Sequence, residues 1–332
     1  MPVLKRAAGA PPRSDRGVAL DLRMHAMLRL TERAGLPKMH ELPPERSRRS
    51  TDAQALLADG RGPSLWRVRD DRIAGADGPL DARIYVPRRS SEPLPLLVFF
   101  HGGGFVIGSL ASHDTLCRVL AREAGCIVVS VAYRLAPEHR FPSAVDDAIA
   151  AFDAVGARAS ELGGRPERVA VGGDSAGGNL SAVVCQATRE REHPPCHQLL
   201  IYPVTDMTRS LPSHRTLAHG FFLEKQTMDC FLEHYTPSTE DRRDVRASPL
   251  LCEDLEGLPP ATVATAGFDA LRDEGEKYAA RLHAAGVDTA HLHEPALVHG
   301  YCNMGRLVPR AAQARRALAR RLGRRLRETA RP

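Results

Sequence analysis

Long apolar runs, paired cysteines and lysine are all scarce in this chain of 332 residues. No run of 18 apolar residues occurs, so neither a membrane-spanning helix nor stable membrane insertion is expected. The seven cysteines are odd in number and none forms a C-x-x-C pair, which argues against a disulfide framework or a zinc site and favours reduced thiols. Residues 1–17 lack the apolar core of a signal peptide. We therefore expect a soluble, cytoplasmic protein.

Lysine supplies only four of the 46 basic residues, although the net charge is +6. The excess lies at the two ends, because residues 1–50 carry a net +6 and residues 305–332 a net +9, whereas residues 51–304 carry a net −9. The arginine bias runs along the whole chain, so no nucleic-acid partner is expected.

The arginine-rich end also has apolar residues at helical spacing, namely Ala311, Ala314, Leu318 and Leu322. This spacing predicts an amphipathic terminal helix packed on the acidic body. A membrane- or nucleic-acid-binding tail is the alternative.

What the chain does contain is a regular alternation of short apolar runs and helix-like segments. After two strands expected within 65–86, the apolar runs are 93–100, 126–131, 168–172, 198–202, 261–266 and 291–294. Helical patterns fall between several of them, at 116–124, 143–155 and 176–191. The fold class expected is α/β, with a mostly parallel central sheet flanked by helices.

The alternation breaks at residues 205–247, which are charged and helix-prone and contain no apolar strand. In an open α/β sheet such an excursion favours a helical cap over the carboxyl ends of the strands, where ligands bind; a long surface loop is the alternative. The expected units are 1–50 as the N-terminal part of the cap, 51–204 as the first part of the core, 205–247 as the inserted part of the cap and 248–332 as the rest of the core.

The strongest local signal is a G-x-S-x-G motif at residues 173–177, directly after an expected strand and before a helix. A sharp turn there exposes the Ser175 hydroxyl at a helix N-terminus, and the small residues Gly173 and Gly177 let neighbouring backbone approach. A glycine-rich phosphate cradle is the alternative. However, no lysine follows to make a Walker loop, and G-x-G-x-x-G is absent at this position.

A second signal is the run His101-Gly-Gly-Gly-Phe105, which follows an earlier expected strand. Three consecutive glycines cost backbone entropy, so they indicate that bare amides must point at a ligand. An oxyanion needs two or three such donors, and the candidates are the amides of Gly103, Gly104 and Ala176. A flexible loop is the alternative.

With these two motifs the chain resembles the hormone-sensitive-lipase-like branch of the α/β-hydrolases, the bacterial family IV carboxylesterases. The resemblance covers nearly the whole chain and includes further motifs: Tyr133-Arg-Leu-Ala-Pro-Glu138, Phe141-Pro142, Asp147, Tyr202-Pro203, Asp269-Ala-Leu-Arg-Asp-Glu-Gly275 and His299-Gly300-Tyr301. It implies an α/β-hydrolase fold with a helical cap and a serine esterase activity that needs no metal or cofactor. The departures, Ala270 after the acid and Tyr301 after His-Gly, remove no functional atom.

The expected catalytic residues are Ser175, Asp269 and His299, in the order that this fold requires. Asp269 lies just past an expected strand, whereas the nearby Asp273 and Glu274 are expected to be helix caps or solvated charges. His291 and His293 are rivals to His299, but they fall in or near a strand, while His299 lies in a loop before Gly300.

The expected reaction is hydrolysis of short- to medium-chain acyl esters. An apolar pocket is predicted around Phe105, Phe221, Phe222 and Leu223; packing inside the cap is the alternative role of these residues. The motifs do not distinguish an esterase from a deacetylase or amidase of one metabolite. A non-catalytic receptor on this fold is disfavoured, since the similar plant gibberellin receptors lack the histidine that is present here as His299. The only partner expected is a small-molecule ester, and a homodimer is compatible with the sequence.

Overall fold

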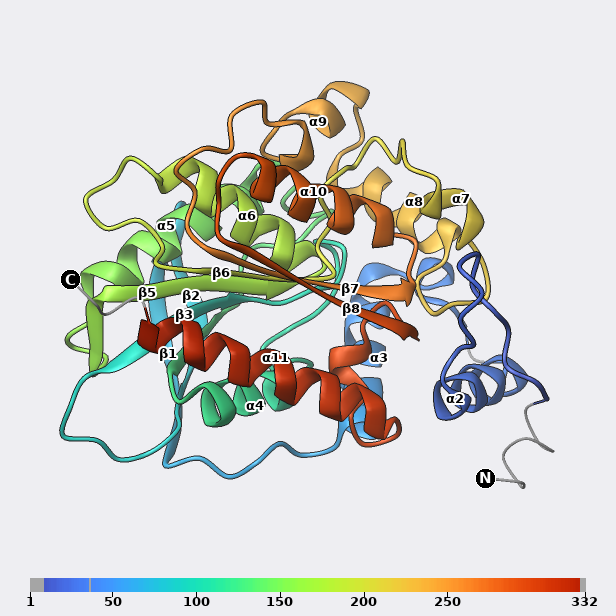
Figure 1. Ribbon diagram of the computed structural model, residues 1–332, viewed down its shortest axis with the longest axis horizontal. Coiled ribbons are helices and arrows are strands. Elements are labelled where there is room, and N and C mark those ends of the chain that lie inside the picture. Colours follow the sequence, from blue (N-terminus) through green and yellow to red (C-terminus); the bar gives the residue numbers. More distant parts are fainter. Residues whose placement is uncertain (1–8, 36, 329–332) are drawn as a thin grey trace.

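Eight strands form one sheet through the middle of the molecule, in the order β1-β2-β4-β3-β5-β6-β7-β8 (Figure 1). The computed structural model describes residues 9–35 and 37–328. Strands β3 to β8 run parallel, and β2 is antiparallel to its neighbours β1 and β4. The strands are β1 (Arg67–Gly75), β2 (Gly78–Val86), β3 (Leu94–Phe100), β4 (Ile127–Val131), β5 (Gly164–Asp174), β6 (Gln198–Ile201), β7 (Ala261–Phe268) and β8 (Thr289–Val298). The expected mostly parallel α/β sheet is confirmed.

Helices cover both faces of this sheet (Figure 1). One face carries α4 (Asp114–Ala124) and α11 (Pro309–Glu328); the other carries α5 (Ser143–Ala157), α6 (Ala176–Thr188) and α10 (Arg272–Ala284). Each face has its own apolar core, and alternate side chains of β3 enter the two. Because the central strands are buried on both sides, they need the nearly continuous apolar runs seen in the sequence.

The arginine-rich end forms α11, whose apolar side packs against α4. Ala311, Ala314, Leu318 and Leu322 are all buried, so the predicted amphipathic helix is confirmed. Its arginines bind acidic groups of the body: Arg320 pairs with Glu123, Arg310 with Glu294 and Arg325 with Asp288.

One arginine of α11 lies on the buried side. Arg315 donates to Asp59 at 2.5 Å and to the Cys302 carbonyl oxygen at 2.7 Å. Asp59 also accepts a hydrogen bond from the Gly305 amide at 3.0 Å. Since Asp59 is the last residue of α3 (Pro44–Asp59), this buried pair joins α3 to α11.

Several further helices gather near the carboxyl ends of the strands (Figure 1). They are α2 (Leu22–Arg33), the 3₁₀ turn η1 (Met39–Glu41), α3, α7 (Ser213–Thr216) and α8 (Lys225–Tyr235), whereas α9 (Thr239–Arg243) lies above α10 in the view of Figure 1. The N-terminal and inserted segments touch, because Lys38 pairs with Glu224 at 2.6 Å and His40 Nδ1 lies 3.0 Å from Thr227 Oγ1.

The expected boundary after residue 50 falls inside α3. A proline at the first helical position starts this helix rather than ending the one before it, so the N-terminal helical segment runs to Asp59. Within the described residues, no helix is both long and apolar enough to cross a membrane.

Candidate active site

Ser175 stands on a sharp turn between the end of β5 and the first residue of α6. Its φ of 54° lies in the left-handed region, which is strained for a residue with a side chain. The turn is tight enough that a Cβ atom at Gly177 would overlap the Phe100 carbonyl oxygen, and one at Gly173 would overlap Gly177. Glycine at both flanking positions is therefore a steric requirement of the turn.

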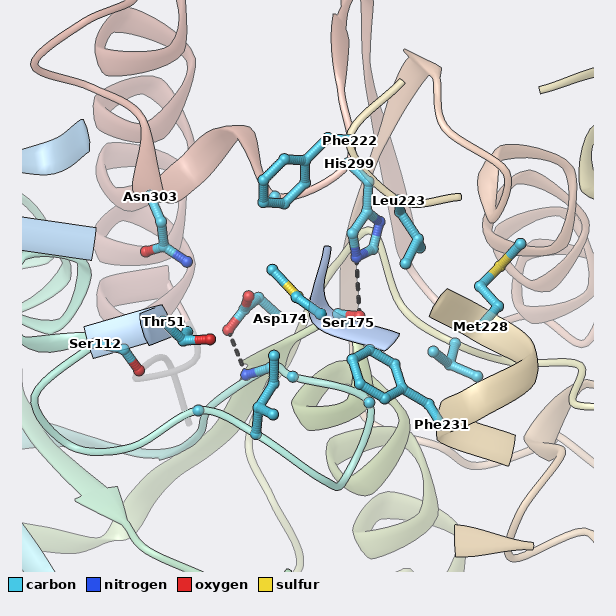
Figure 2. Close-up of a pocket in the computed structure, with 18 of the residues that line it drawn as sticks. Thr51, Ser112, Asp174, Ser175, Phe222, Leu223, Met228, Phe231, His299 and Asn303 are labelled. Atoms are coloured by element: carbon cyan, nitrogen blue, oxygen red, sulfur yellow. Dashed lines mark hydrogen bonds between the residues drawn. The ribbon is translucent and has the colours of Figure 1, made fainter. Parts of the chain in front are cut away.

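Three side chains from three separate segments meet at this turn. Ser175 Oγ lies 2.9 Å from His299 Nε2, and His299 Nδ1 lies 2.8 Å from Asp269 Oδ2 (Figure 2 shows the first contact). The carboxylate can only accept, so His299 donates its Nδ1–H to Asp269 and keeps Nε2 free to accept the serine proton. Asp269 is fully buried, and its second oxygen accepts from the Leu271 amide at 2.8 Å.

The glycine loop after β3 lies on the other side of Ser175. Gly103 and Gly104 have φ values of 121° and 60°. A Cβ atom would overlap the Ile107 carbonyl oxygen at the first and the Phe231 ring at the second. Within the described part of the chain, no hydrogen bond occupies the amides of Gly103, Gly104 or Ala176. Three free donors thus lie beside the serine, which is what a developing oxyanion needs.

A buried network that the motifs did not reveal holds this loop. Asp174 accepts from the Gly102 amide at 2.9 Å (Figure 2), and His113 Nε2 lies 3.1 Å from the same carboxylate. Burial alone would raise the pKa of Asp174, but His113 and the Gly102 amide outweigh it and lower that pKa. Burial works against the charged form of His113 as well, yet the Asp174 charge raises the pKa of this imidazole.

The network continues from His113 to the N-terminal helix α3. His113 Nδ1 lies 2.9 Å from Ser112 Oγ, which accepts from the Ser109 amide at 2.8 Å. Ser109 Oγ in turn donates to Asp52 of α3 at 2.6 Å. Asp52 and Ser109 are 57 residues apart in the chain, so no local sequence pattern indicates their contact.

A cavity of about 300 Å³ opens beside Ser175 and His299. Its walls come from the glycine loop, from α3 and from the inserted segment around α8. Figure 2 shows the two sides of this cavity: Phe222, Leu223, Met228 and Phe231 gather near Ser175, whereas Thr51, Ser112 and Asn303 lie together on the other side. The space beside the serine is therefore mainly apolar, with a few hydroxyl and amide groups.

A family model described as the alpha/beta hydrolase fold matches residues 97–303. The chain belongs to the α/β-hydrolase family. Its curated relatives include the carboxylic ester hydrolase LipN of Mycobacterium tuberculosis, 49% identical over 247 residues. That match spans 72% of this chain and 65% of LipN, slightly less than two thirds of the relative's length. The ethyl acetate hydrolase of Pseudomonas putida is 38% identical over 278 residues, which are 82% of this chain and 87% of that enzyme.

Solved structures resemble this hydrolase over almost all of its length. An ester hydrolase from the metagenome of Lake Arreo, complexed with a bipyridine phosphonate derivative, superposes with a TM-score of 0.89 at 42% identity, covering 92% of this chain and 98% of that one. The Pyrobaculum calidifontis esterase gives 0.84 at 36% identity, covering 94% and 99%. The resemblance to the hormone-sensitive-lipase-like carboxylesterases, expected from the motifs, is confirmed.

The hydrolase brings together most of the residues expected in its pocket. Phe222 and Leu223 line the cavity, as does Phe105, whose ring stacks on Tyr235 with centroids 4.0 Å apart. Phe221 does not line it, because its ring packs on Phe268, with centroids 5.0 Å apart. The expectation for Phe221 is therefore corrected. Phe231, which lies in no recognised motif, also lines the cavity and reaches the glycine loop from α8.

Glu274 is the second correction, since it is neither a cap nor a solvated charge but fully buried in the hydrolase. It accepts from the amides of Thr205 and Asp206 at 2.5 and 3.2 Å and pairs with His214 Nε2 at 2.5 Å. Burial raises the pKa of its carboxyl in spite of His214. Glu274 thus holds the start of the inserted segment in place. Asp273 accepts a hydrogen bond at 2.9 Å from the amide of Ser213, which is the first residue of α7.

Proposed function

We propose that this hydrolase is a serine carboxylesterase that cleaves short- to medium-chain acyl esters through Ser175, His299 and Asp269. One observation carries the proposal: Ser175 Oγ lies 2.9 Å from His299 Nε2 at a cavity wall, and the other ring nitrogen lies 2.8 Å from a buried carboxylate. The ester hydrolases among its relatives support the same reaction class.

In the first half of the reaction, His299 Nε2 takes the hydroxyl proton while Ser175 Oγ attacks the ester carbonyl carbon. Asp269 keeps the imidazole in the productive tautomer and stabilises the imidazolium that forms. The carbonyl oxygen gains negative charge and accepts from the amides of Gly103, Gly104 and Ala176. His299 then returns its proton to the leaving alcohol, which leaves an acyl group on Ser175.

In the second half, water takes the place of the alcohol. His299 accepts a proton from this water as its oxygen attacks the acyl carbon, and the same three amides hold the oxyanion. Collapse of the intermediate breaks the bond to Ser175, which regains a proton from His299, and the carboxylic acid leaves. Every step uses groups of this chain alone.

The size and lining of the cavity support a preference for short or medium acyl groups. About 300 Å³ of mainly apolar space suits an acyl group with a short or medium alkyl chain. The hydrolysis of ethyl acetate named for one relative agrees with this. We further propose that the N-terminal segment up to Asp59 and the insertion at 205–247 act as one cap, since both contribute cavity walls and pair through Lys38 and Glu224.

The test combines Ser175→Ala with covalent labelling by a fluorophosphonate. We expect Ser175→Ala to lower kcat for a short p-nitrophenyl ester by about 10⁴-fold or more, with unchanged unfolding temperature. The wild type should take up one fluorophosphonate, mapped to Ser175, and the variant none. Near-normal turnover by the variant, or labelling at another residue, would contradict the assignment. A matched ester and amide pair then distinguishes an esterase from an amidase.

A further inference from the structure

Two histidines and a glutamate converge on the outer edge of the sheet, away from the cavity. His291 and His293 are two residues apart on the edge strand β8, so their side chains leave the same face. Helix α10 crosses that face and carries Glu276 (Figure 1). One ligand atom from each of these three side chains lies within 4.8 Å of the other two.

The two imidazoles already point at a common position, which the Thr265 hydroxyl on β7 now takes up. Thr265 Oγ1 lies 2.7 Å from His291 Nε2 and 2.9 Å from His293 Nδ1. A hydroxyl has a single proton, so it donates to one of these nitrogens and must accept from the other. An ion bound between these nitrogens would displace the Thr265 hydroxyl, and the donor atoms, which lie within 4.8 Å of one another, would close to the spacing of about 3.3 Å that a tetrahedral zinc site requires.

The three side chains of the cluster are accessible from solvent. His291 is exposed and His293 is half-buried, so an ion can enter from solvent.

Arg16 is the cation that holds Glu276 in this arrangement. Its guanidinium donates to both carboxylate oxygens at 2.7 Å and is about half exposed. The neighbouring Asp15 is fixed independently by a bidentate pair with Arg272, at 2.6 and 2.8 Å. Release of the Glu276 carboxylate would require Arg16, which also lies 3.6 Å from Asp273, to turn into solvent, while Asp15 would still anchor the N-terminal turn.

We propose that Glu276, His291 and His293 form a binding site for a divalent transition-metal ion such as Zn²⁺, with water as the fourth ligand. Two nitrogen donors and one carboxylate suit Zn²⁺, Cu²⁺ or Ni²⁺, whereas Mg²⁺ and Ca²⁺ prefer oxygen ligands alone. Arg16 competes with the ion for the Glu276 carboxylate, and this competition lowers the affinity of the site for the metal.

The test titrates the metal-free, full-length protein with zinc chloride and follows binding by calorimetry. We expect the His291→Ala/His293→Ala variant to bind one zinc equivalent fewer than the wild type. Each single variant should weaken zinc binding at this site by at least about tenfold. Loss of an outer-shell partner already costs about that much, and a direct ligand contributes more. The control is His193→Ala, which removes an exposed imidazole with a single carboxylate 3.9 Å away. Zinc that binds elsewhere on the protein contributes equally to the wild type and to each variant, so it does not affect the difference between them.

Arg16 and Glu276 provide the second arm of the test. Arg16→Ala should tighten zinc binding several-fold, and Glu276→Gln should weaken it and abolish the gain from Arg16→Ala. Unfolding temperatures measured in a chelator verify that every variant is folded. Equal zinc binding by the wild type and the double histidine variant would overturn the site. An Arg16→Ala variant that binds zinc no better than the wild type, with no effect of Glu276→Gln, would remove Glu276 from it and overturn the three-ligand proposal.

Discussion

Asp174 accepts a hydrogen bond from the Gly102 amide at 2.9 Å, and so couples the serine turn to the glycine loop. The carboxylate belongs to the residue just before Ser175, while the amide belongs to the residue just before Gly103. A shift of either segment therefore moves the serine and the oxyanion donors together. Close approach makes this coupling strict, because a Cβ atom at Gly102 would lie 2.6 Å from Asp174 Oδ2.

Asp174→Asn should lower kcat by roughly ten- to hundredfold with little change in KM, less than the loss of an oxyanion donor itself. The asparagine oxygen can still accept from Gly102, but the charge that holds His113 is gone, so the loop loses its fixed position. Steady-state kinetics on a short ester measure the effect. An equal rise in KM with unchanged kcat would mean that Asp174 acts on substrate binding instead.

Stability should depend on pH through His113. The raised pKa of the folded imidazole means that its contribution is complete below the unfolded value of about 6.5 and is lost as the pH rises through the folded value. Unfolding temperatures of the wild type and of His113→Gln, measured from pH 5 to pH 9, should therefore differ most at the acidic end and converge towards the alkaline end. Parallel profiles would contradict a His113 charge in the folded state.

Gly104→Ala should reduce kcat by at least about a hundredfold, since the new methyl group overlaps the Phe231 ring and displaces the loop. Gly125→Ala is the matched control: its φ of 71° is also positive, but nothing lies within 4 Å of the added atom. That control should cost about 1–2 kcal/mol of stability and leave kcat intact. If both variants lost activity equally, backbone strain rather than the loop position would be responsible.

Phe231→Ala should shift the preference towards longer acyl chains, because the ring lines the cavity next to Gly104. The ratio of kcat/KM for a longer ester to that for an acetate should rise roughly tenfold, the order expected for a methylene accommodated in an apolar pocket. Phe221→Ala removes an equal ring outside the cavity and should leave the ratio unchanged. If Phe221→Ala changed this ratio and Phe231→Ala did not, the acyl group would bind beside Phe221 instead.

The strands and the meeting of Ser175, Asp269 and His299 were predictable because each has a local signature, an apolar run or a motif at a strand end. Phe221 and Phe222 differ by one position along the chain, and only the packing of Phe268 decides which of them enters the cavity. Glu274 was misjudged because its partners are amides at 205–206, almost 70 residues away. A separation of 61 residues likewise hid the pairing of Asp174 with His113.

The pair between Asp59 and Arg315 ties one wall of the active cavity to the helix α11. Helix α3 lines the cavity and ends at Asp59, whose side chain is buried against Arg315. Loss of Arg315 would leave the Asp59 carboxyl group buried without its cation, which is strongly unfavourable. A substitution in α11 can therefore disturb the cavity through this single ion pair, although α11 contributes no residue to the cavity wall itself.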